Sequence, residues 1–298
     1  MADSLGPDDP VHRENSVTLG KPGEHGDAFR PDNRIEPSDP VGTAARLRAR
    51  VTEATRLLRT SADRISDHQA REPSLLPGWS RGHLLTHLAR NADGLRNLLI
   101  WARTGVPTPF YRDLDERSEA IERGSGRSAA DLLADLDDSA AALDAEAAPL
   151  PEAAWAVQVS GVMGEEHPAW YTLWRRLTEV EIHHVDLDVG YGPANWPEAF
   201  ATYCLEQAAA SFAGTHAPAV TLRGDDASVV VQIGELGDQP VTTVTGPHRT
   251  LLAWLTGRGS GDGLTAEPAG PLPTLPSCQP AGPYPRKVQS GATRSGKA

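Results

Sequence analysis

The sequence predicts a helical bundle followed by a small α+β domain. Four long stretches with the helical spacing of apolar residues come first. They are comparable in length and are joined with one long connection, which is typical of a four-helix bundle. After Pro193 the pattern changes to short β-branched runs between helical stretches, which indicates a second unit of the α+β class.

Apolar spacing and helix-terminating residues together locate the bundle helices. We expect these helices at residues 41–68, 80–103, 128–148 and 168–189. Ser80 follows a Pro-Gly-Trp turn and is an N-cap candidate, while Pro149 ends the third helix. Pro168 fits the first turn of the fourth helix, where a proline removes no helical hydrogen bond, and Gly190 follows the end of this helix.

The smaller domain begins with an Ala-rich helix near residues 197–212. Three short strands are expected where β-branched residues cluster, at residues 219–222, 228–233 and 241–244. Gly246 and Pro247 then start a final helix, which ends at Gly257.

We therefore expect four segments in the chain. The bundle occupies residues 41–192 and the small α+β domain residues 193–264. Residues 1–40 and the Pro-rich residues 265–298 are expected to be disordered tails. Both segments are poor in large apolar residues and cannot bury enough surface to offset the entropy of ordering.

Composition argues against several classes of protein. The formal net charge of −12 argues against nucleic acid and anionic membranes as partners. No segment approaches the roughly 18–20 apolar residues of a membrane span, and the N-terminus lacks the pattern of a signal peptide. Cys204 and Cys278 are far apart and form no disulfide framework, so we expect a cytoplasmic protein.

The fourth predicted helix carries a candidate metal site. Glu179 and His183 are four residues apart and therefore lie one above the other on the helix surface. A carboxylate and an imidazole stacked in this way can bind one divalent metal. On the second helix, His87 lies on the flank of the apolar face and could supply a third ligand, whereas His83 points further away, toward the surface or the first turn.

Two alternatives to a metal site stay open at this point. Arg176, Glu179, His183 and Asp186 share one stripe, and such a stripe is most often a solvated, salt-bridged face. His87 alone is more often a buried, hydrogen-bonded histidine than a ligand. If the stripe points inward, Asp186 could fix an imidazole, and Arg176 could orient Glu179 or meet a substrate carboxylate.

Three blocks of sequence resemble the mycothiol-dependent maleylpyruvate isomerase family. They are residues 76–95 (LPGWSRGHLLTHLARNADGL), 176–187 (RLTEVEIHHVDL) and 253–258 (AWLTGR), and the resemblance covers roughly residues 43–262. It implies a DinB-like four-helix bundle with a bound metal, usually zinc, followed by a domain similar to sterol carrier proteins. By position, the implied metal ligands are His87, Glu179 and His183, and the implied catalytic arginine is Arg258. From the residues alone, Arg258 could equally be a cation near a helix C-terminus.

The resemblance also implies an activity. This is the cis–trans isomerisation of maleylpyruvate to fumarylpyruvate in gentisate breakdown, with a thiol that adds to the double bond and leaves again. Neither cysteine lies in the motif helices, so the thiol is expected to come from outside the chain. The resemblance implies that this thiol is mycothiol, with a divalent metal as Lewis acid. Arg258 would then pair with a substrate carboxylate.

The expected partners are this small anionic substrate and the low-molecular-weight thiol. The oligomeric state stays open, with a monomer as one option. One alternative activity is a mycothiol S-transferase that uses the same metal site. Another alternative, of a different class, is a non-catalytic protein that binds apolar ligands.

Overall fold

The computed structural model describes residues 39–161, 164, 166–210, 212, 217–227, 230–234 and 241–276. Most of the two predicted tails, residues 1–38 and 277–298, lies outside the described residues. Among the helices of the described part, none combines the length and the apolar character that a membrane crossing requires.

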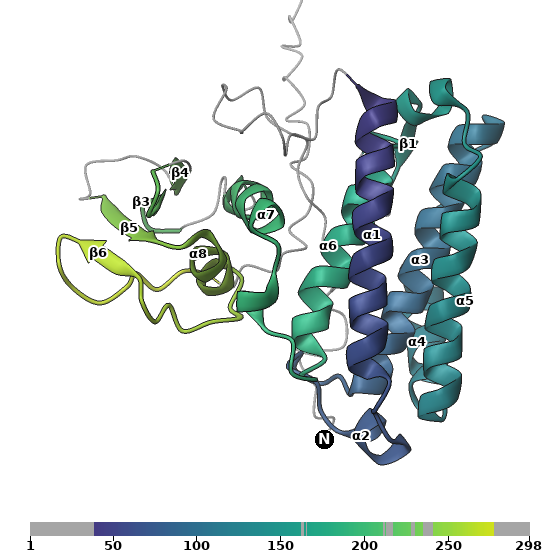
Figure 1. Ribbon diagram of the computed structural model, residues 1–298, viewed down its shortest axis with the longest axis horizontal. Helices are drawn as coiled ribbons and strands as arrows, with labels where there is room; N and C mark the ends of the chain where they lie inside the picture. The colour runs from purple at the N-terminus through teal and green to yellow at the C-terminus, as the bar shows by residue number, and fades with distance from the viewer. Residues whose placement is uncertain are drawn as a thin grey trace, which may run out of the picture.

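Four long helices lie side by side and form the bundle (Figure 1). They are α1 (Pro40–Ala62), α3 (Arg81–Thr104), α5 (Ala129–Ala147) and α6 (Tyr171–Asp186). The sequence dictates where three of them begin, because the side chains of Asp39, Ser80 and Ser128 each accept a hydrogen bond from a backbone N–H of the first turn. Gly105 ends α3 in the left-handed conformation, with a φ of 72°, which favours glycine. The predicted N-cap at Ser80 is confirmed.

Two predicted helix boundaries are wrong, each for a local reason. The helix expected over residues 41–68 ends at Ala62, and Ser66 then caps a separate short helix, α2 (Asp67–Arg71), through a capping box with Gln69. Pro168 is not in the first turn of the fourth helix. It ends β2 (Glu166–Pro168), which pairs antiparallel with β1 (Gln158–Ser160), and α6 begins three residues later.

A helix that the sequence did not predict packs against α3. This helix, α4 (Leu114–Ser125), begins where the Asp113 side chain accepts a hydrogen bond from the backbone N–H of Glu116. The loop before it approaches α3 at Gly94, where an added Cβ would come within 2.8 Å of the Phe110 carbonyl oxygen. Glycine at this position therefore allows the loop and α4 to lie against the bundle.

The second unit holds a four-stranded sheet with two helices. Its helices are α7 (Glu198–Ala210) and α8 (His248–Leu255). Its strands, in the spatial order β4-β3-β5-β6, are β3 (Val220–Gly224), β4 (Val230–Ile233), β5 (Thr242–Gly246) and β6 (Thr265–Glu267). The β3–β5 pair is parallel and the other two pairs are antiparallel. The predicted α+β class is confirmed, but β6 lies in the segment that was expected to belong to the C-terminal tail.

Helix α6 is enclosed on all sides. It packs against α1 and α3 within the bundle, and on another side aromatic residues of α7 in the second unit contact it (Figure 1). Trp174 contacts the rings of Phe200 and Tyr203 on α7, and the Trp196 indole donates to the Glu181 carbonyl oxygen. Every residue of α6 is buried as a result. The charged stripe therefore lies in the interior and is not a solvated face.

Candidate metal centre

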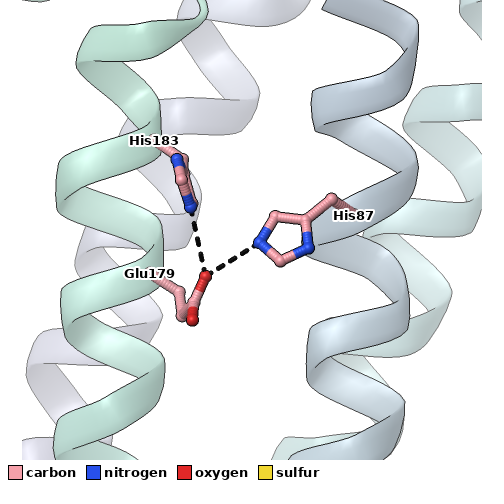
Figure 2. Close-up of side chains that lie close together, drawn as sticks. All are labelled: His87, Glu179 and His183. Atoms are coloured by element: carbon pink, nitrogen blue, oxygen red, sulfur yellow. Dashed lines mark hydrogen bonds and ion pairs between the residues drawn. The ribbon is translucent and has the colours of Figure 1, made fainter. Parts of the chain in front are cut away.

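Three side chains from two neighbouring helices converge inside the bundle (Figure 2). Glu179 and His183 come from successive turns of α6, and His87 reaches them from α3. Oε2 of Glu179 lies 2.9 Å from Nε2 of His87 and 3.3 Å from Nε2 of His183. The structure therefore brings together the three residues that the sequence proposed as ligands.

The triad is buried, and its two imidazoles stabilise the charge of its carboxylate. The side chains of His87, Glu179 and His183 are 0%, 1% and 2% exposed. Burial alone would raise the pKa of Glu179, yet hydrogen bonds from His183 and His87 hold this pKa well below its usual range. Burial lowers the pKa of His87 to about 4, so His87 is neutral at pH 7.

His183 is held from both sides by carboxylates. Its Nε2 faces Glu179, and its Nδ1 lies 2.9 Å from Oδ2 of Asp186. Burial opposes the charged form, but the hydrogen bonds to Asp186 and Glu179 prevail and raise the pKa of His183 to about 9. At neutral pH the imidazolium therefore donates to both carboxylates. The expectation that Asp186 fixes an imidazole agrees with this contact.

Arg258 comes from the second unit and pairs with Asp186. Its Nε donates to Oδ1 at 3.1 Å and its Nη2 donates to Oδ2 at 2.8 Å, which is a bidentate pair. Its Nη1 donates to the Thr256 carbonyl oxygen. The fork that the sequence analysis assigned to a substrate carboxylate is thus occupied by Asp186. A continuous chain of contacts runs from Glu179 through His183 and Asp186 to Arg258.

The sequence did not predict Arg117 beside the triad, because it did not predict α4, nor Tyr111 in the segment before this helix. Nη2 of Arg117, on α4, donates to Nδ1 of His87 at 3.1 Å. The guanidinium also lies over the ring of Tyr111, 5.7 Å from its centre. The amphipathic pattern of residues 114–125 could have indicated the helix, but no feature of the sequence links Arg117 to His87.

Arg176 lies one turn before Glu179 but bonds elsewhere. Its Nη1 donates to the Leu88 carbonyl oxygen at 2.7 Å and to Oδ1 of Asn91 at 3.0 Å, both on α3. Its influence on Glu179 is electrostatic, and that carboxylate in turn favours the charged guanidinium. The suggestion that Arg176 orients Glu179 or meets a substrate carboxylate stays a prediction.

His83 is placed as the sequence suggested, and Trp79 lies beside it. His83 lies in the first turn of α3, where Nδ1 contacts the Ser80 hydroxyl at 2.7 Å and Nε2 contacts Glu122 at 3.4 Å. Trp79 packs against the ring of His87, with ring centres 5.4 Å apart. Neither side chain belongs to the triad, and the indole shields one face of the His87 ring.

The donor set fits a divalent metal. One oxygen and two imidazole nitrogens lie within 4.8 Å of one another. Ligand atoms around tetrahedral zinc are roughly 3.4 Å apart, because each lies about 2.0–2.2 Å from the ion. The two contacts of Glu179 are close to that spacing. Three protein ligands of the N, O and N type leave a fourth position for a water or a substrate, which is typical of catalytic zinc sites.

Comparison with known proteins agrees with the fold. A family model described as the mycothiol maleylpyruvate isomerase N-terminal domain matches residues 35–188, and the MDMPI C-terminal domain matches residues 195–277. The first of these models spans more than half of the chain.

Solved structures resemble the chain over most of its length. The crystal structure of the mycothiol-dependent maleylpyruvate isomerase has a TM-score of 0.73 and 28% sequence identity, and the match covers 78% of this chain and 96% of that chain. A second crystal structure, of a variant with a histidine replaced by alanine, gives the same values. A comparison with curated proteins finds no match. Because the two family models together match most of its length, the chain belongs to the mycothiol maleylpyruvate isomerase family.

Proposed function

We propose that the chain catalyses the mycothiol-dependent isomerisation of maleylpyruvate to fumarylpyruvate at a metal bound by His87, Glu179 and His183. The single observation that carries this proposal is the buried triad of two imidazoles and one carboxylate in a chain of this family. A purely apolar-ligand-binding protein would gain nothing from burying three ionisable groups together, since desolvation of a carboxylate is costly.

The bound metal, which we expect to be zinc, would act as a Lewis acid for the substrate oxygens and would favour the thiolate form of mycothiol. The protein residues around it prepare this site. Asp186 accepts a hydrogen bond from Nδ1–H of His183, and this bond fixes the imidazole with Nε2 toward the metal centre. Burial of the triad excludes water and strengthens each of these interactions.

Arg258 is proposed as a positioning residue that acts through Asp186. Its bidentate contact holds the carboxylate against His183 and keeps it ionised at neutral pH. Burial alone would raise the pKa of Asp186, but the hydrogen bond from His183 and the charge of Arg258 lower it. Because Arg258 follows α8, this contact also couples the second unit to the metal centre.

The thiol nucleophile is proposed to come from outside the chain. Cys204 is fully buried on α7, and Cys278 lies outside the described residues. A low-molecular-weight thiol that acts as a cofactor must stay reduced, so we also propose that the enzyme works in the cytoplasm, in the breakdown of gentisate.

The experiment that tests the proposal is an absorbance assay of maleylpyruvate with metal-loaded and chelated protein, each with and without mycothiol. We expect fumarylpyruvate to form only when both metal and thiol are present, and the thiol to be recovered unchanged. Consumption of one thiol per substrate with a stable conjugate as product would instead establish the S-transferase activity. Turnover by chelated protein would exclude the proposed metal role.

A further inference from the structure

The two imidazoles of the triad have opposite partners at their outer nitrogens. Nδ1 of His183 lies 2.9 Å from a carboxylate oxygen of Asp186, and an ionised carboxylate can only accept a hydrogen bond. Nδ1 of His87 lies 3.1 Å from Nη2 of Arg117, and a guanidinium can only donate. Carboxylates, backbone carbonyls and water are the usual outer partners of metal-ligating histidines. The partner of His183 is therefore of the usual kind, whereas the partner of His87 is not.

The contact with Arg117 fixes the position of the proton on His87. Nδ1 of this imidazole must accept, because every N–H group of the guanidinium is a donor. A neutral imidazole carries one ring proton, which is then on Nε2. Nε2 faces Glu179 and donates to Oε2 of this carboxylate at 2.9 Å (Figure 2). The structure therefore holds His87 in the tautomer that has its proton on Nε2.

This tautomer of His87 is unsuitable for a metal ligand. Nε2 is the nitrogen that faces the centre, and a ring nitrogen binds a metal only through a lone pair that carries no proton. If the proton moves to Nδ1, two N–H donors face each other across 3.1 Å. His87 is fully buried and Arg117 is 7% exposed, so the surroundings offer little water to relieve this contact. Metal binding by Nε2 of His87 and the hydrogen bond from Arg117 therefore exclude each other.

A second partner for the guanidinium lies next to it. The guanidinium carbon of Arg117 is 5.7 Å from the centre of the Tyr111 ring, within the range of a cation–π contact. The Tyr111 hydroxyl is buried and has no hydrogen-bond partner among the described residues, and the same is true of Nε of Arg117. A phenol oxygen can accept a hydrogen bond. A guanidinium that leaves Nδ1 of His87 can therefore bond to this hydroxyl instead.

We propose that Arg117 is a positioning residue that holds metal-free His87 in its non-ligating tautomer and must release this ring when a metal binds. This role rests on the proposed function, since it needs a metal bound by His87, Glu179 and His183. The two imidazoles are then unequal, because the carboxylate at Nδ1 supports metal binding by His183, whereas the guanidinium opposes metal binding by His87. The positive charge of Arg117 adds to this opposition, since like charges repel strongly in a buried site. Arg117 therefore keeps the metal affinity of the centre below what its three ligands would otherwise give.

Zinc affinity, measured by competition with a coloured chelator, tests the proposal. Arg117→Gln replaces the guanidinium by an amide, whose oxygen can accept a hydrogen bond from Nδ1–H of His87. We expect this variant to bind zinc about ten- to a hundredfold more tightly than the wild type, the usual range for an outer partner of a ligating histidine. Arg117→Met removes the donor and the charge but supplies no acceptor, so its zinc affinity should lie between the two. Loss of a merely structural contact would lower the affinity instead.

A matched control comes from the same helix. Arg123 is exposed on α4 and pairs with Glu119 at the surface, so Arg123→Gln should have the zinc affinity of the wild type. Equal or weaker zinc binding by Arg117→Gln, next to a wild type that binds zinc, would overturn the role of Arg117 and leave the metal site standing. A wild type that binds no zinc would overturn the proposed metal site and this role together.

The tautomer of His87 can be measured without any substitution of Arg117. Long-range proton–nitrogen NMR of isotope-labelled histidines shows which ring nitrogen carries the proton, and His87→Gln assigns the signals. We expect the proton on Nε2 of His87 in metal-free protein and on Nδ1 after zinc is added. A proton on Nδ1 in metal-free protein, or an Nδ1 that stays unprotonated after zinc has bound, would overturn the proposal.

Discussion

Asp186→Asn is the substitution whose effect the structure defines most fully. The two carboxylate oxygens of Asp186 face three donors, namely Nδ1–H of His183 and the Nε–H and Nη2–H groups of Arg258. An asparagine has one carbonyl oxygen and one NH₂ group. Whichever way the amide turns, its NH₂ group meets a donor, and the charge that stabilises the two cations is lost.

The expected magnitude follows from the hydrogen bonds that are lost. A hydrogen bond to a charged group is worth about 1.5–3 kcal/mol, and about 1.4 kcal/mol corresponds to a tenfold change in affinity. We therefore expect Asp186→Asn to weaken zinc binding about 10- to 100-fold. This range agrees with the usual effect of removing the partner of a metal-ligating histidine.

Competition with a chromophoric chelator measures this affinity directly. The matched control is Asp188→Asn, since Asp188 lies just beyond α6 but is exposed, and the side-chain contact recorded for it in the described structure is with Arg81. A surface pair of this kind contributes at most about 1 kcal/mol to stability, so zinc affinity in the control should be close to that of the wild type. Equal zinc affinities of Asp186→Asn and the wild type would refute the proposed role of Asp186.

Three further predictions concern the same centre. Arg258→Ala should lower kcat/KM while zinc stays bound, because Asp186 keeps its bond to His183. Arg258→Lys should restore only part of the activity. Full activity of Arg258→Ala would leave Arg258 without a functional role. Apparent zinc affinity should rise about tenfold per pH unit between roughly pH 6 and 8, because the raised pKa of His183 means that one proton must leave before the metal binds. A flat pH profile from chelator competition would contradict this. The double variant Cys204→Ser and Cys278→Ser should keep mycothiol-dependent turnover, and its loss would show that a protein thiol takes part.

The sequence predicts the bundle well where local rules decide the structure. Ser80 and Ser128 cap their helices as their chemistry requires, and the four long helices follow from apolar spacing. Local rules fail where tertiary packing decides. The capping box of Ser66 and Gln69 is a local signal for the end of α1, whereas the β1–β2 pairing before α6 depends on contacts that no window of sequence contains.

Periodicity likewise could not predict whether the charged stripe of α6 faces the interior or the solvent. Spacing places Glu179 and His183 on one face but does not say what covers that face. Packing of α7 over α6 encloses the helix, and this contact joins segments that are distant in sequence. The role of Arg117 was missed for the same reason, since α4 approaches His87 only in the folded chain.

Zinc titration of metal-depleted protein, with maleylpyruvate turnover recorded at each step in the presence of mycothiol, tests the central claim most directly. We predict that turnover rises in proportion to bound zinc and stops rising at one ion per chain in the wild type, while Glu179→Gln neither retains zinc nor gains activity. Full turnover before any metal is added, or a Glu179→Gln protein that binds zinc and works normally, would contradict the assignment of His87, Glu179 and His183 as the metal ligands.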